Sequence, residues 1–196
     1  VSLVSRELAK TQEVAGQYGI GHVTTDLADS LALKEVDAVI LCTPTQLHAA
    51  QAIQCMKADK HVQVEIPLAD SLKDAEAVVA LQNQTGLVAM CGHTRRFNPS
   101  HQWIHDRITA GQLTLQHLVV ETYFFRRTNT NALGQPRSWT DHLLWHHACH
   151  TVDLFAYQTG RPTVGAWAQQ GPRHPELGIA MDMTVGLRSD ADQLCT

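Results

Sequence analysis

Histidines recur at a four-residue spacing late in the chain, at His142, His146 and His150, and Asp153 follows them. Positions four apart share one face of an α-helix, so we expect the imidazoles to line up with the carboxylate one turn further on. Imidazole titrates closest to neutral pH and can accept and return a proton. The pattern therefore predicts an acid–base helix over residues 138–159.

Two other interpretations of these histidines stay open. His146 and His150 have the spacing of a zinc pair, but no glutamate stands beside His146 as in metalloprotease helices, and no third ligand is well placed. We therefore expect no metal. Filling of a polar helix–sheet interface suits His142 and His147, whereas we expect His146 and His150 to act in acid–base chemistry. For Asp153 a supporting role and a purely structural role are equally compatible with the sequence.

Arginines follow the predicted strands 87–91 and 113–125. Guanidinium binds carboxylate through two parallel hydrogen bonds and keeps its charge. We expect Arg95, Arg126 and Arg127 to bind a small carboxylated substrate, and Arg96 to pair within the protein. An ordinary surface ion pair is the alternative for each of them.

The first half of the chain alternates strands and helices. Apolar strands are expected at residues 1–5, 37–42, 61–65 and 87–91, and helices at 7–18, 46–58 and 71–85. Continuous apolar strands with helical crossovers indicate a parallel sheet covered on both faces. Residues 1–93 are thus predicted to be a Rossmann-type, doubly wound α/β domain that binds a dinucleotide.

The second half, residues 94–196, predicts an α+β domain with a mainly antiparallel open sheet. Its expected helices cover 99–110 and 138–159, and its strands 113–125, 164–170, 181–187 and 193 onward. The chain starts without Met inside a strand and stops inside another. We therefore expect an internal piece of a longer protein, with the first strand and the glycine-rich phosphate turn upstream.

Ligands of open α/β sheets lie at the carboxyl ends of the strands. Ser5 and Arg6 end the first strand, and position 5 is not an acid. An acid there selects the 2′-hydroxyl of NAD, whereas arginine and a small hydroxyl accept the 2′-phosphate of NADP. NADP is favoured and NAD remains possible; a solvent-facing Arg6 is the alternative.

The ends of the next two strands supply further candidates. We expect Thr43 and Thr45 to offer hydroxyls to the coenzyme ribose, with Pro44 holding the turn, although Thr45 could also be a helix N-cap. His48 is expected to point toward the same crevice. Glu65 ends the following strand and is expected to contact the nicotinamide ribose.

Composition excludes several classes of partner. The chain is 44% hydrophobic and 17% charged with net charge −4, so nucleic acid and anionic membranes are not expected partners. The apolar runs are too short to cross a bilayer. The five cysteines have no paired spacing, which predicts free thiols in the cytoplasm.

Four segments, taken in order, resemble the Gfo/Idh/MocA family of nicotinamide-dependent oxidoreductases: 37–45 with His48, 60–67, 92–99 and 146–153. Within the family, residues 94–99, 123–127 and 137–147 most resemble NADP-dependent semialdehyde dehydrogenases of bacterial protocatechuate breakdown by 4,5-cleavage. The resemblance implies that Ile66 and Pro67 belong to the coenzyme site, that a cis bond joins them, and that the protein is a homodimer.

The sequence departs from the wider family at two positions. Ile66 stands where a lysine is usual, and His146 stands where an acid usually precedes the motif histidine, His150. Both departures fit the semialdehyde dehydrogenases. The resemblance implies oxidation of the hemiacetal form of 4-carboxy-2-hydroxymuconate-6-semialdehyde to 2-pyrone-4,6-dicarboxylate, with His150 or His146 as base. A sugar or polyol dehydrogenase of the same family, or a non-catalytic cofactor-sensing regulator, is the alternative.

Overall fold

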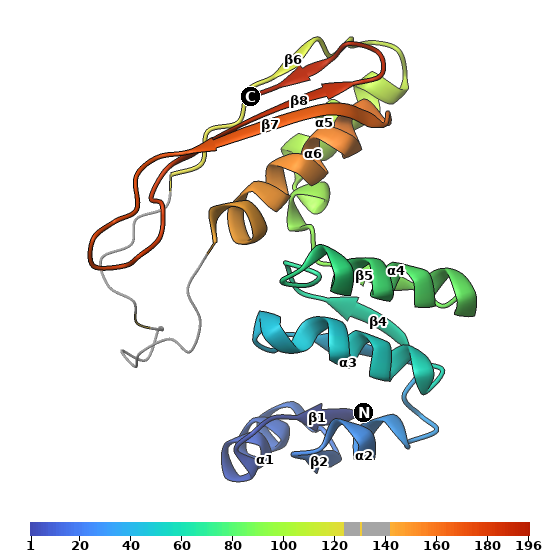
Figure 1. Ribbon diagram of the computed structural model, residues 1–196. Coiled ribbons are helices and arrows are strands. Elements are labelled where there is room, and N and C mark those ends of the chain that lie inside the picture. The colour runs from blue at the N-terminus through green and yellow to red at the C-terminus, as the bar shows by residue number, and fades with distance from the viewer. Residues whose placement is uncertain (124–129, 131–141) are drawn as a thin grey trace. The chain divides into compact units, whose positions relative to one another are not determined.

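The computed structural model describes residues 1–123, 130 and 142–196 (Figure 1). The chain divides into two compact units, Val1–Gly92 and His93–Thr196, and each is described by itself. In the described part of the chain, none of the helices has the length and apolar character needed to cross a membrane.

The first unit begins with a pair of parallel strands, β1 (Ser2–Val4) and β2 (His22–Thr24). Between them runs α1 (Leu8–Tyr18), which ends at Gly19 with φ +67°, a left-handed conformation that glycine adopts at little cost. The short helix α2 (Leu27–Leu31) follows β2, and the side chain of Asp26 caps it by accepting the Ala28 N–H.

A second parallel sheet has the order β3 (Ala38–Leu41), β4 (His61–Val64), β5 (Ala89–Cys91). Its crossovers are α3 (Thr45–Lys57) and α4 (Leu72–Thr85), as expected for βαβ units. The core gathers apolar side chains from the strands and both helices: Leu41, Ala52, Cys55, Met56, Val62, Val64 and Val78. The predicted parallel α/β class is confirmed, with the strands distributed over two sheets.

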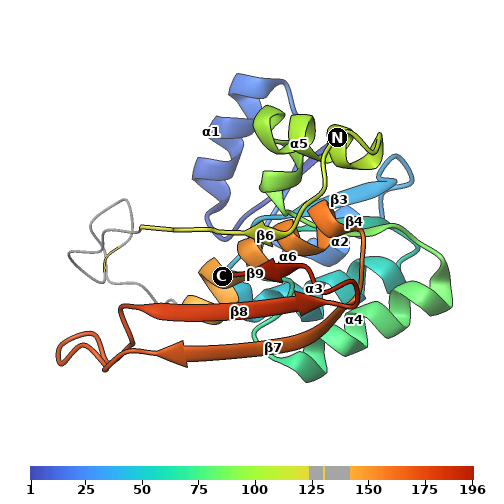
Figure 2. The same ribbon diagram turned by 90° about the horizontal axis from the view of Figure 1, so that it is seen from above.

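The second unit begins with a 3₁₀ turn, η1 (Thr94–Phe97), and α5 (Pro99–Thr109). Its sheet has the order β6 (His117–Leu118), β9 (Leu194–Cys195), β8 (Met183–Ser189), β7 (Thr163–Gln170). The β7–β8 and β8–β9 pairs are antiparallel and β6–β9 is parallel, so the predicted mainly antiparallel sheet is confirmed. Figure 2 shows the long β7–β8 ribbon.

The prediction of a long strand at 113–125 is wrong for residues 113–123, which the structure describes. Only His117 and Leu118 form a strand, because they pair with the two residues of β9 and a strand needs a partner to continue its ladder. Residues 124 and 125 lie outside the described part of the chain.

The histidine helix also differs from the prediction. A π-helical segment, η2 (Leu143–Ala148), precedes the α-helix α6 (Cys149–Thr159). His142 has extended backbone angles (φ −114°, ψ 125°) and lies before the helix. Since π-helical turns are wider than α-helical ones, the prediction of three imidazoles on one continuous α-helical face is wrong. Residues 138–141 lie outside the described part.

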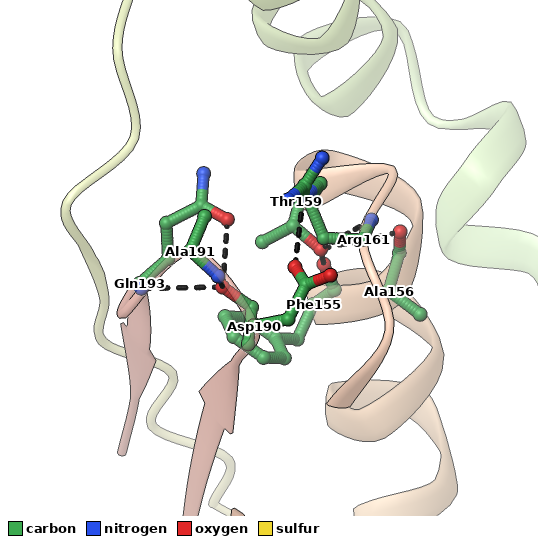
Figure 3. A network of polar contacts seen from close by, with 8 residues as sticks. Phe155, Ala156, Thr159, Arg161, Asp190, Ala191 and Gln193 are labelled. Atoms are coloured by element: carbon green, nitrogen blue, oxygen red, sulfur yellow. Dashed lines mark hydrogen bonds and ion pairs between the residues drawn. The ribbon is translucent and has the colours of Figure 1, made fainter. Parts of the chain in front are cut away.

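Helix α6 packs on the sheet through Phe155, which is fully buried with Leu187 and Cys195. Figure 3 shows how its C-terminal end is fixed. The Thr159 hydroxyl donates to the Phe155 carbonyl (2.8 Å) and accepts the Arg161 N–H (3.3 Å), and Arg161 pairs with Asp190 at 2.7 Å. These contacts hold the C-terminal end of the helix against the turn between β8 and β9.

Candidate active site

Two histidines of the second unit face one another. His93 precedes η1, and His150 is the second residue of α6. Their ring centroids are 6.3 Å apart, and the rings meet edge to face at 86°. Among the described residues, no group hydrogen-bonds the buried Nδ1 of either ring. Each ring can therefore take up a proton at Nδ1 without breaking a bond to those residues.

Sequence reasoning missed His93. The sequence did contain an indication of it. His93 comes two residues after the last residue of β5, and Thr43 and Glu65 were predicted as site residues because they also follow the ends of strands. The four-residue histidine spacing instead placed His142 on the same helical face as His146 and His150, and His142 lies before the helix.

An ion pair orders the groups next to His93. Arg96 donates three hydrogen bonds to the Asp153 carboxylate, at 2.6, 2.9 and 3.1 Å. The expectation that Arg96 pairs within the protein is thereby confirmed. Asp153 is only 10% exposed, and its Oδ1 lies 3.9 Å from the His93 Nε2. Asp153 is thus a fixed carboxylate beside His93, held in place by a guanidinium.

The surroundings favour neutral imidazoles. Burial lowers the pKa of His150 from its ordinary 6.5, and Arg95, His93 and His147 lower it further, against a smaller opposing effect of Asp153. Burial also lowers the pKa of His93; there Asp153 opposes the shift and Arg96 adds to it. A neutral imidazole has a nitrogen lone pair, so at neutral pH both rings are in the form that accepts a proton.

His146 differs from His150 in its hydrogen bonding. Its Nδ1 lies 2.9 Å from the backbone nitrogen of His142 and 3.3 Å from the His142 carbonyl oxygen. The shorter contact favours an Nδ1 that accepts the His142 N–H, which places the hydrogen of the neutral ring on Nε2. His146 is then suited to donate a hydrogen bond and His150 to accept a proton.

Of the predicted substrate arginines, the structure describes only Arg95. Its Nη2 donates to the Thr122 hydroxyl at 3.2 Å, and its carbonyl contacts the His101 ring at 3.0 Å, which steadies η1. Arg95 also lies close enough to His150 to lower its pKa. Arg126 and Arg127 lie outside the described residues.

A cavity of about 330 Å³ lies where the start of the histidine helix approaches the sheet. Leu143, His147 and Thr151 line it from the helix, and Met181, Asp182 and Val185 from the sheet side. Its described lining is mostly apolar, with one carboxylate and no lysine or arginine. The interface position expected for His147 agrees with this lining. The cavity suits a neutral group better than a carboxylate.

In the first unit, the loops at the carboxyl ends of β3 and β4 are joined through His48. Its Nδ1 contacts the Pro67 carbonyl and its Nε2 the Thr43 carbonyl, each at 2.7 Å, and the residue is 1% exposed. Both nitrogens are engaged, so His48 fixes these two loops in place.

The other loop residues are held as follows. Thr43 donates to Gln51 (2.6 Å), and Thr45 donates to Asp70 (3.2 Å). Pro44, not Thr45, is the N-cap of α3. Glu65 accepts the Ile66 N–H at 3.3 Å, and the Ile66–Pro67 bond is cis, as the resemblance implies.

Ser5 and Arg6 are exposed just after β1. The nearest acid along the chain, Glu7, pairs with Lys10 at 2.8 Å, and this contact lowers the Glu7 pKa. The end of β1 therefore presents a hydroxyl and an exposed cation, while the loops after β3 and β4 are fixed in place. These residues fit a nicotinamide dinucleotide.

Comparison with known proteins matches both units. The model described as "Oxidoreductase family, NAD-binding Rossmann fold" matches residues 1–93, and "Bacterial oxidoreductases, C-terminal" matches residues 99–196. The whole chain is 65% identical to a 4-carboxy-2-hydroxymuconate-6-semialdehyde dehydrogenase from Sphingobium sp. (strain NBRC 103272 / SYK-6), of which it spans 62%. Over 113 residues (58% of this chain, 34% of the relative) it is 32% identical to a 1,5-anhydro-D-fructose reductase from Ensifer adhaerens.

Solved structures agree on the fold. A probable dehydrogenase from Thermotoga maritima superposes with a TM-score of 0.82 at 19% identity, covering 99% of this chain and 59% of that one. The WlbA dehydrogenase from Bordetella pertussis, in complex with NADH and UDP-GlcNAcA, gives 0.81 at 22% identity, covering 100% and 61%. At these identities the likeness concerns the fold alone.

Proposed function

Since the chain belongs to the Gfo/Idh/MocA family of oxidoreductases, we propose that the protein is an NADP-dependent dehydrogenase of 4-carboxy-2-hydroxymuconate-6-semialdehyde. It would oxidise the cyclic hemiacetal of this compound to 2-pyrone-4,6-dicarboxylate. The observation that carries the proposal is the 65% identity, over the whole chain, to a relative with that name. The family and the named relative make it an oxidoreductase; the substrate and the coenzyme preference are the proposal.

In the proposed reaction the hemiacetal loses two hydrogens from one H–C–O–H group. His150 takes the hydroxyl proton on a ring nitrogen, and the electrons of that O–H bond form the lactone C=O as the C–H bond breaks. When bound, the coenzyme accepts the hydride at nicotinamide C4. His150 suits this step because burial and Arg95 keep its ring neutral. His146 would donate a hydrogen bond and hold the substrate oxygen.

The remaining residues position the reactants. Ser5 and Arg6 would bind the 2′-phosphate, and the loops containing Thr43, Pro44 and Thr45, and Glu65, Ile66 and Pro67, would hold the nicotinamide half, braced by His48. Arg95, with Arg126 and Arg127, would bind the substrate carboxylates. We extend the proposal to a homodimer. We also place the protein in the cytoplasm, with which its five free cysteines are consistent.

One observation favours a second candidate, a sugar or polyol dehydrogenase. The described lining of the cavity beside the histidine helix has hydroxyls and one acid but no cation, as a neutral polyol would require. Ile66 and His146 oppose this reading, because the family's lysine and acid are absent there.

The test uses the full-length protein with NADP or NAD, supplied with the semialdehyde or with cyclic polyols such as inositol. We expect reduced coenzyme to form with the semialdehyde and NADP, and the pyrone to appear in mass spectra. Arg6→Gln should weaken NADP binding about tenfold or more, the value of one charge-assisted hydrogen bond, and leave NAD binding unchanged. Turnover confined to the polyols would favour the second candidate, and coenzyme binding without turnover of any substrate would indicate a regulator.

A further inference from the structure

His93 and His150 lie close enough to affect one another's protonation. Two imidazolium rings with centroids 6.3 Å apart repel. In a half-buried setting this repulsion amounts to about one to two pKa units. The two rings therefore titrate as a coupled pair and take up their protons one after the other.

The fixed charges decide which ring is protonated first. His93 has the Asp153 carboxylate 3.9 Å from its Nε2, and the other charge that acts on it is Arg96. His150 faces Arg95, His93 and His147, and Asp153 has the smallest effect on it. The one carboxylate acting on both rings favours imidazolium mainly at His93, and Arg95 disfavours it at His150.

We propose that His93 and His150 bind a single proton between them at mildly acidic pH, with His93 as a positioning residue that keeps a His150 nitrogen free to accept the substrate proton. This inference rests on the proposed function for the role of His150 as base. His93 takes up the first proton, and its positive charge shifts the protonation of His150 to lower pH. The neutral, working form of the base then persists over a wider acid range.

The experiment compares the pH dependence of kcat for the full-length enzyme and its His93→Phe variant. Phenylalanine keeps an aromatic ring against His150 and removes the titrating group. Without His93, His150 takes up its proton at higher pH, so the acid limb of the profile should move up by about one pH unit. At pH 8, where His150 is neutral in both proteins, kcat should stay within about threefold, and near pH 6 it should fall by up to about tenfold.

His105→Phe is the matched control. His105 also has a buried Nδ1 that no described residue hydrogen-bonds, and it stacks on Tyr157 at 3.9 Å, without being among the charges that act on His150. We expect its acid limb to coincide with that of the parent. A purely structural role of His93 would lower kcat at every pH and leave the limb in place, and that result would overturn the proposal.

A titration of the histidine ring signals by NMR separates this inference from the proposed function. The His150 signal, assigned by its loss in His150→Asn, should titrate about one unit higher in His93→Phe whether or not the semialdehyde is the substrate. If this shift occurs and the parent does not oxidise the semialdehyde, the coupling of His93 and His150 is supported and the proposed substrate is wrong. If the parent oxidises the semialdehyde and His93→Phe moves neither the acid limb of the kcat profile nor the His150 titration, the coupling is wrong and the proposed function is supported.

Discussion

The His48 ring should be the strongest single support of the loops at the carboxyl ends of β3 and β4. His48→Leu replaces the ring with a side chain of similar size and removes the two ring nitrogens, which lie 2.7 Å from the Thr43 and Pro67 carbonyl oxygens. Because the residue is 1% exposed, water does not readily replace it. A neutral imidazole has one N–H group, so one buried carbonyl loses its donor, at a cost of about 1–3 kcal/mol. We therefore expect a loss of about 2 kcal/mol in the free energy of unfolding.

Denaturant unfolding of the full-length protein, with and without saturating NADP, measures this loss. His48→Gln keeps one side-chain N–H group within reach of one carbonyl and should lose about half as much. Gln46→Leu, an exposed change on the same helix α3, should stay within about 0.5 kcal/mol of the parent. The loops after β3 and β4 would also lose their fixed positions, so the Kd for NADP should rise in His48→Leu. A loss below about 1 kcal/mol, or equal losses for Leu and Gln, would show that the hydrogen bonds of His48 do not hold these loops.

Three further predictions concern the second unit. Arg96→Met should cost about 2 kcal/mol of stability, because it leaves the 10%-exposed Asp153 without its cation. Asp153→Asn should cost only about 1 kcal/mol, because Arg96 is 44% exposed and water can solvate its charge. Equal costs in denaturant unfolding would contradict this asymmetry. Cys149→Ser should keep kcat within about threefold, because burial raises the Cys149 pKa to about 11 and the thiol is not an available nucleophile; a loss above about a hundredfold would favour a covalent thiohemiacetal. The free energy of unfolding should fall as the pH drops below 6.5, because His93 and His150 have lowered pKa values and the unfolded chain binds more protons there. A flat profile between pH 7 and the folded-state values would contradict it, and His93→Phe should reduce the slope.

The alternating first unit could be predicted from the sequence because its signals are local. Buried parallel strands such as 38–41 and 61–64 appear as uninterrupted apolar runs, and Gly19 and Gly86 mark where α1 and α4 end. The positions of Thr43 and Glu65 at strand ends followed from the same pattern. The two bonds of His48 did not, because they join residues 5 and 19 positions away through the folded loops.

The second unit was harder for the opposite reason. Whether residues 113–123 form a strand depends on the extent of β9, a partner almost 80 residues later in the chain. The π-helical segment at Leu143–Ala148 shifts the register of the histidines, and no residue type in the sequence indicates it. His93 meets His150 only through packing across 57 residues of chain, which spacing along one helix cannot reveal.

The role of His150 as base is tested most directly by His150→Asn in the full-length protein, with reduced NADP followed as the semialdehyde is supplied at a pH near 8. Asparagine keeps the polar character of the position and removes the proton acceptor. We expect kcat to fall by about a hundredfold or more, the usual contribution of a general base, with the Kd for NADP changed by less than about threefold. Turnover that stays near that of the parent would contradict it, because another group would then be taking the proton.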